Sequence, residues 1–142
     1  PIPVAPPRAA SPGRERPPLP APGTSLQETW TALVGWCAGA GIADGGLLAD
    51  AAGAVVAARG EPPVGAPGEL LDGLSGALAP ARRSAGDGPS AAAVDVGGRW
   101  MTAFAVAARG RGDLVAILWG AAPLRSGVRS ALASWLGEAL SR

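Results

Sequence analysis

Among the eleven acidic residues of this 142-residue sequence, four aspartates are the candidates considered for acid–base chemistry, because paired carboxylates can move protons to and from a substrate. Each stands where the chain is expected to turn or where a strand is expected to end. Short acidic side chains in such places usually accept hydrogen bonds from nearby backbone amides. We therefore interpret these four as turn and cap residues: Asp44, Asp50, Asp95 and Asp113.

Other catalytic chemistries lack the residues that they need. The sequence contains no histidine and no lysine, which excludes histidine-based triads, histidine metal ligation, P-loops and Schiff bases. Cys37 is the single cysteine, so no disulfide can form within the chain and no thiolate cluster can bind a metal. We expect a protein that is not an enzyme, holds no cofactor or metal, and works in the reducing cytoplasm.

Two weaker patterns point to nucleotides or nucleic acids. Glycines at 39–41 loosely resemble a phosphate-binding loop, but a helix is expected before them and a strand after them, which is the reverse of the required order. Five tryptophans could stack on bases, yet the net charge is only +1 and no basic patch accompanies them. We expect no nucleic-acid binding, and we expect Trp100 to be the most exposed of the five.

Proline composition divides the chain. Residues 1–23 are proline-rich and have no apolar periodicity, so they are predicted to be a disordered tail or linker. Arg14, Pro17 and Pro20 match the spacing of an SH3-type ligand, which stays an alternative to a plain linker. Residues 24–142 suffice for one domain. No apolar run reaches the roughly 18 residues of a membrane-spanning helix, so no membrane insertion is expected.

Hydrophobic periodicity predicts eight elements in the order α-β-β-α-β-β-β-α. A capping box at Ser25–Glu28 begins the first helix, and Gly97-Gly98 is a two-residue hairpin signal. A two-strand hairpin and a three-strand meander can share one sheet if the last strand pairs with the first. This predicts an α+β domain with three helices and a five-stranded antiparallel sheet of order 2-1-5-4-3. The predicted helices are 25–39, 67–84 and 124–141, and the predicted strands are 46–49, 54–58, 91–96, 99–107 and 114–119.

Several motifs of this layout resemble the Roadblock family, the dynein light-chain relatives that include bacterial regulators of small Ras-like GTPases. The resemblance covers about residues 26–141, and it depends on the order and spacing of the motifs rather than on any one of them. The second predicted helix departs from the family, because it carries glycines and Pro80. The motifs are Gly46-Leu-Leu-Ala-Asp50, Ala-Ala-Gly53-Ala-Val-Val-Ala, Val94-Asp-Val-Gly-Gly98, Trp100, Gly110-Arg-Gly112-Asp113 and the closing helix.

The resemblance implies a dimer, with itself or with a paralogue, in which the third strands pair edge to edge and the second helices pack together. The sequence supports both contacts: strand 91–96 has no proline or lysine to blunt its edge, and small residues on the second helix permit close approach. The predicted dimer interface is Gly73, Gly76, Ala77, Ala91, Ala93, Val94 and Asp95. The resemblance also implies partner-binding residues, for which we select Asp72, Ser75, Arg82 and Arg83.

Two functions follow from these expectations. The first is a non-catalytic dimeric scaffold or regulator of a small Ras-like GTPase in bacterial signalling, a source that the bias toward Ala, Gly, Arg and Pro favours. The second is a small-molecule sensor, because profilin-like and PAS-like domains share much of this layout and carry a pocket between sheet and helix. The sensor would need polar groups directed into that pocket.

Overall fold

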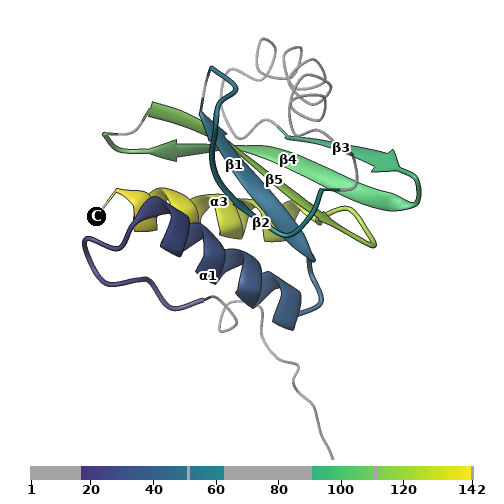
Figure 1. Ribbon diagram of the computed structural model, residues 1–142, viewed down its shortest axis with the longest axis horizontal. Coiled ribbons are helices and arrows are strands. Elements are labelled where there is room, and N and C mark those ends of the chain that lie inside the picture. The colour runs from purple at the N-terminus through teal and green to yellow at the C-terminus, as the bar shows by residue number, and fades with distance from the viewer. Residues whose placement is uncertain (1–16, 51, 63–90, 111, 142) are drawn as a thin grey trace, which may run out of the picture.

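The computed structural model describes residues 17–50, 52–62, 91–110 and 112–141. Within these ranges it has two helices and five strands, in the predicted order, as Figure 1 shows. The predicted helix over 67–84 lies outside the described residues, so the described part confirms two of the three predicted helices. The elements are α1 (Leu26–Gly39), β1 (Gly45–Asp50), β2 (Val55–Arg59), β3 (Ala91–Val96), β4 (Arg99–Ala108), β5 (Gly112–Gly120) and α3 (Ser126–Leu140).

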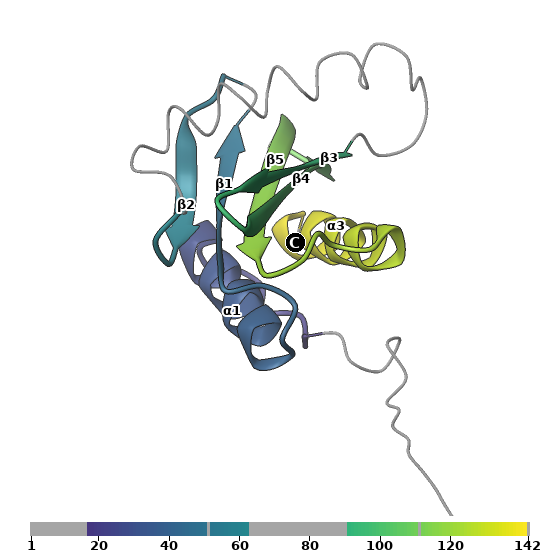
Figure 2. The same cartoon turned by 90° about the vertical axis from the view of Figure 1, so that its right-hand side faces the viewer.

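The five strands form one antiparallel sheet in the order β2-β1-β5-β4-β3, which confirms the predicted topology. β5 closes the sheet by pairing with β1 on one side and β4 on the other. β2 and β3 are therefore the two edge strands. Figure 2 shows α1 and α3 side by side on the same face of the sheet.

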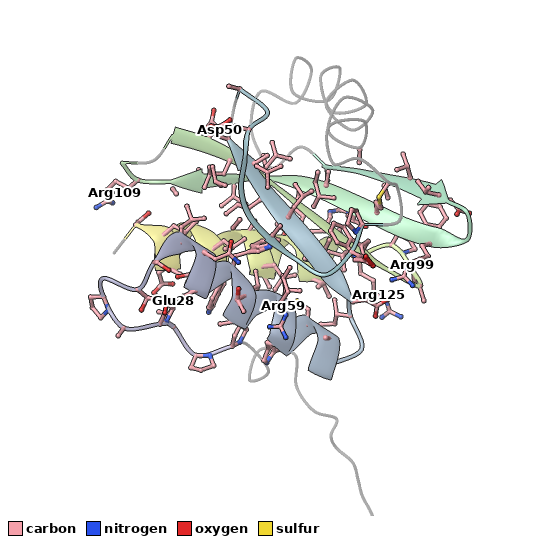
Figure 3. All side chains as sticks on the ribbon, viewed as in Figure 1. Glu28, Asp50, Arg59, Arg99, Arg109 and Arg125 are labelled. Atoms are coloured by element: carbon pink, nitrogen blue, oxygen red, sulfur yellow. The ribbon has the colours of Figure 1, made fainter. Side chains whose placement is uncertain are left out.

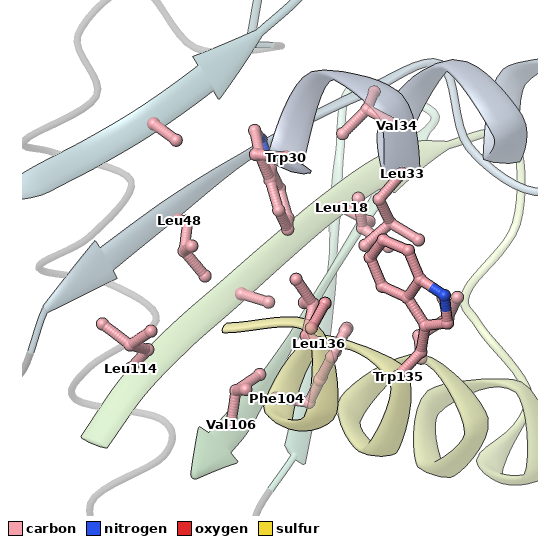
Figure 4. Packing of buried hydrophobic residues seen from close by; sticks show 14 of the residues in the cluster. Trp30, Leu33, Val34, Leu48, Phe104, Val106, Leu114, Leu118, Trp135 and Leu136 are labelled. Atoms are coloured by element: carbon pink, nitrogen blue, oxygen red, sulfur yellow. The ribbon is translucent and has the colours of Figure 1, made fainter. Parts of the chain in front are cut away.

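The core between the helices and the sheet is built from large side chains, several of which Figure 4 shows. Trp30 of α1 and Trp135 of α3 are fully buried there with Phe104 of β4. The indole Nε1 of Trp30 donates to the Gly46 carbonyl at 3.0 Å, so the buried polar atom is satisfied. Burying each such side chain contributes about 2–3 kcal/mol, which makes this the main stabilising layer of the domain.

The N-terminal segment reaches this core earlier than the predicted boundary at residue 24. Pro17 is buried, and its carbonyl accepts a hydrogen bond of 2.8 Å from Trp135 Nε1. Residues 1–16, which include Arg14 of the SH3-type motif, lie outside the described residues. Of the motif's described residues, Pro17 is buried and bonded to Trp135.

The opposite face of the sheet buries a second, smaller cluster. Side chains alternate between faces along a strand, so residues next to those of the helix-facing core point the other way. No residue of α1 or α3 belongs to this cluster. Its members are Leu47, Ala49, Met101, Ala103, Val115, Ile117 and Trp119, with Ala92, Val94 and Val96 packed against them. The central strands are thus buried on both faces, which explains their nearly unbroken apolar sequences.

The turns confirm two interpretations of the aspartates. Asp50 Oδ1 accepts the amides of Ala52 and Ala54, both at 2.9 Å. Asp95 Oδ1 accepts the Gly98 amide at 2.9 Å. Gly97 and Gly98 have φ of +61° and +90°, as a type I′ hairpin turn requires. These carboxylates hold turns.

Candidate functional site

The free edge of β3 is the described feature best suited to bind another protein. Val96 and Arg99 flank the two-residue turn and pair with each other, so they exchange the hydrogen bond that closes such a turn. Hydrogen-bonded and non-bonded pairs alternate along an antiparallel ladder. The backbone groups of Ala91, Ala93 and Asp95 therefore point away from β4. We call these outward groups the β3 edge.

In the described part of the chain the β3 edge has no second strand beside it, because β3 stands at the end of the sheet order. Ala93 is exposed, and Ala91 is half-buried against the helix-facing core. Asp95 is the one charged side chain of β3, and its bond to the Gly98 amide holds it at the turn. Val94 points to the other face, where it packs on the second cluster. β3 is short, its side chains other than Asp95 are apolar, and nothing described covers the β3 edge.

The opposite edge of the sheet is occupied. Ala58 of β2 directs its backbone amide and carbonyl away from β1, and both groups bind the side chain of Gln27 on α1. The Ala58 amide donates to Gln27 Oε1 at 3.3 Å, and Gln27 Nε2 donates to the Ala58 carbonyl at 3.0 Å. A primary amide thus takes the place that one residue of an added strand would take. We call these outward groups of β2 the β2 edge.

Arg59 adds a second link between β2 and α1. Its Nη1 donates to the Thr31 carbonyl at 2.7 Å, and Figure 3 shows its side chain against the helix. A Cβ added to Gly35 would lie 2.7 Å from the same nitrogen, so the glycine leaves room for the guanidinium. α1 therefore contacts β2 over two turns, and Gln27 supplies the bonds to the backbone groups of the β2 edge. No comparable contact reaches the β3 edge from any described residue.

Of the remaining candidate groups for chemistry, Asp44 is paired, Cys37 is inert, and Asp113 is an exposed residue at the start of β5. Asp44 pairs with Arg99 at the surface. Burial raises the pKa of the Cys37 thiol to about 12, which keeps it protonated and unreactive. No group of three or more metal-ligating side chains comes together among the residues that the structure describes. Within the same ranges, no helix is long and apolar enough to cross a membrane.

A sensor pocket would need polar groups between the sheet and the helices. The buried polar side chains of the described residues are Thr29 and Thr102. Thr29 Oγ1 donates to the Ser25 carbonyl at 2.9 Å, and Thr102 Oγ1 accepts the Leu124 amide at 3.1 Å. Both hydroxyls thus support the fold. Large apolar side chains fill the space around them, and nothing described favours the sensor.

The structure brings together only part of the predicted interface. Ala91, Ala93, Val94 and Asp95 lie on one edge strand, with three of the four presenting backbone groups outward. The contact between Gln27 and the β2 edge was missed by reasoning from the sequence. The predicted residues of the second helix lie outside the described ones: Asp72, Gly73, Ser75, Gly76, Ala77, Arg82 and Arg83.

Comparison with protein-family models, with curated proteins and with solved structures finds no match to this chain. The resemblance to the Roadblock family therefore stays a prediction from motif order and spacing.

Proposed function

We propose that this chain is a non-catalytic, cytoplasmic protein-interaction domain that dimerises through the β3 edge. The observation that carries the proposal is the contrast between a β3 edge with nothing described beside it and a β2 edge occupied by α1. Exposed edges of this kind pair readily with another strand. A second copy of β3 is the simplest such strand.

The outward groups of β3 suit a symmetric pairing. Residues whose backbone groups point outward must face each other across a new antiparallel ladder. Placing Ala93 of each copy on the two-fold axis satisfies this condition and sets Ala91 opposite Asp95 of the partner subunit. The two aspartates then lie apart on either side of the axis, which avoids the repulsion between like charges directly opposite each other. The sheet would become continuous over ten strands.

The proposed task of the dimer is to scaffold or regulate a small Ras-like GTPase, which the resemblance to the Roadblock family supports. In that proposal Asp72, Ser75, Arg82 and Arg83 contact the GTPase, and the helix that carries Gly73, Gly76 and Ala77 packs on its copy. Chemistry on the nucleotide would belong to the GTPase. No described group of this chain needs to take part in catalysis for this function.

Solution mass tests the dimer directly. We expect sedimentation equilibrium of the 142-residue chain to give twice its mass of 13.9 kDa at micromolar concentration. Ala93→Pro removes one outward amide from β3, and an edge strand tolerates proline at such a position. This variant should therefore give the mass of one chain. Ala93→Ser keeps the amide and serves as the matched control. A wild-type chain that stays a monomer up to hundreds of micromolar would contradict the proposal.

Titration with a purified small Ras-like GTPase from the same genome tests the partner. We expect binding of the dimer that weakens when Arg82→Ala and Arg83→Ala are combined, with the mass of the dimer unchanged. Arg109→Ala, on an exposed turn at the far end of β4, is the matched control. Equal affinity of all three proteins, or no binding in either nucleotide state, would remove the GTPase from the proposal and leave the dimer standing.

A further inference from the structure

We infer that Gln27 determines which edge of the sheet can pair, because its side chain occupies the β2 edge and leaves the β3 edge as the one available to a second copy. The part of this inference that concerns the β3 edge rests on the proposed function, in which two copies pair through that edge. It adds a specificity-determining residue and a latent second interface, formed by the β2 strands of two copies.

The side chain of Gln27 bonds to the backbone of Ala58 as a residue of an added strand would. An incoming antiparallel residue would accept one hydrogen bond from Ala58 and donate another to it. Gln27 makes the same two bonds, at 3.3 Å and 3.0 Å. Its remaining amide hydrogen has a partner too, since Nε2 lies 3.0 Å from Thr31 Oγ1 on the next turn of α1. A second chain could approach Ala58 only by displacing this amide.

Local structure holds Gln27 in place. Ser25 and Glu28 form a complete capping box, with Glu28 N to Ser25 Oγ at 3.0 Å and Ser25 N to Glu28 Oε1 at 3.3 Å. The box fixes the first turn of α1, in which Gln27 stands. The Arg59–Thr31 contact then fixes the next turn against β2. The amide is therefore oriented before any partner arrives, so it competes well with a strand.

Without the side-chain amide of Gln27, the β2 edge would be prone to pair with another strand. Val55 and Val56 are 42% and 39% exposed, and Leu19 is the other large apolar side chain exposed in the described part of the chain. β2 has no proline, and its charged residue Arg59 is bound to α1. An apolar edge strand with free backbone groups is a template for association. The expected occupant is β2 of a second copy, because both strands then bury their valines.

The consequence depends on symmetry. A dimer formed at the β3 edges carries two β2 edges, one at each end. If the β2 edges at both ends of the dimer pair with other dimers, no point-group symmetry closes the assembly. Open chains of dimers then form. Gln27 thus limits the assembly to a closed pair.

The test is the solution mass of Gln27→Ala, a substitution that keeps a good helix former on an exposed position. We expect its mass to rise with concentration beyond that of the wild type, while Thr31→Val, which keeps the Gln27–Ala58 bonds, behaves as the wild type. Gln27→Glu cannot donate to the Ala58 carbonyl and should also assemble further. Hydrogen exchange of the Ala58 amide, measured where Gln27→Ala is still dilute, should be at least tenfold faster than in the wild type.

The outcomes separate the inference from the proposed function. If the wild type is a monomer and Gln27→Ala associates, Gln27 controls the β2 edge and the β3 dimer is wrong. If the wild type is a dimer and Gln27→Ala remains one, with Ala58 exchange unchanged, the inference is overturned. Gln27→Ala combined with Ala93→Pro has only the β2 edge left and should stop at a dimer; a monomer would count against the latent interface.

Discussion

The two edge strands of this sheet are alike in composition but differ in the contacts that other described residues make with them. β2 is five residues and β3 six, both are rich in alanine and valine, and each carries one charged residue. On β2 that residue, Arg59, is bound to α1, and Gln27 fills the backbone groups of Ala58. On β3 the charge of Asp95 is held at the turn. Edge character is therefore decided by neighbours rather than by the strand's own residues.

The comparison also explains why one edge can serve function. An unpaired strand carries a risk of uncontrolled association, and a domain with two such strands would form chains. Here a helix side chain bonds to the backbone groups of Ala58 at one edge. In the proposed dimer the other edge, which no described residue covers, would pair with a second copy.

The largest expected effect is the difference in stability between proline variants at two neighbouring positions of β3. Ala92→Pro removes an amide bonded to β4 opposite Ala103, and Ala93→Pro removes an outward one. Leaving a buried carbonyl without its donor costs about 1–3 kcal/mol, so Ala92→Pro should lower the free energy of unfolding by about 2 kcal/mol. Ala93→Pro should change it by less than about 0.5 kcal/mol. Urea titration at a concentration where both are monomers measures this; equal losses would mean that the assignment of outward groups is wrong.

The hairpin turn that sets the outward groups of β3 comes next. Gly98 has φ +90° and an added Cβ would meet nothing within 4 Å, so any penalty comes from backbone conformation alone. We expect Gly98→Ala to cost about 1–2 kcal/mol in thermal or urea unfolding. Gly97→Asn is the matched control, because asparagine is favoured at the first position of a type I′ turn. A larger loss for the asparagine variant would exclude this turn type.

The element order and sheet topology were predictable because turns and hydrophobic patterns are local. Gly97-Gly98, Asp50 and the capping box at Ser25 each mark a boundary within a few residues, and the structure confirms all three. The limits of β2 were shifted by one residue. A shift of this size is common at strand ends. The β1–β2 pairing also changes register between Leu48 and Ala49, which nothing in the sequence signals.

The occupied β2 edge could not be predicted, because it depends on how α1 lies against the sheet. Gln27 and Ala58 are 31 residues apart, and a glutamine in the first turn of a helix has the pattern of an ordinary surface residue. Conversely, Ala91, Ala93, Val94 and Asp95 were named from the resemblance to the Roadblock family, and the sheet order confirms only that they lie on an edge strand. The residues selected for partner binding, such as Arg82 and Arg83, stay predictions.

Ser25→Ala should have an intermediate effect on the β2 edge. The loss of the cap is expected to cost about 1 kcal/mol, and it frees the first turn that orients Gln27. We therefore expect both a lower melting temperature and faster exchange of the Ala58 amide. Ser25→Asp keeps an N-cap acceptor and should restore both. If exchange at Ala58 stays slow while stability falls, the capping box does not position Gln27.

The smallest expected effect is on the stability contributed by a surface ion pair, and it tests whether edge geometry depends on surface charge. Asp44 and Arg99 form an ion pair whose side chains are 62% and 43% exposed, and exposed pairs contribute little because water and salt screen them. Asp44→Asn should lower the free energy of unfolding by less than about 0.5 kcal/mol. The difference should vanish in about 1 M salt, where the Debye length is about 3 Å. The Asp44 amide keeps its 2.8 Å bond to the Trp119 carbonyl in either case, so β1 begins in the same place and Ala58 exchange should not change. A loss above about 1 kcal/mol that survives high salt would instead make this pair an anchor of the sheet, and edge geometry would then depend on surface charge as well as on backbone bonds.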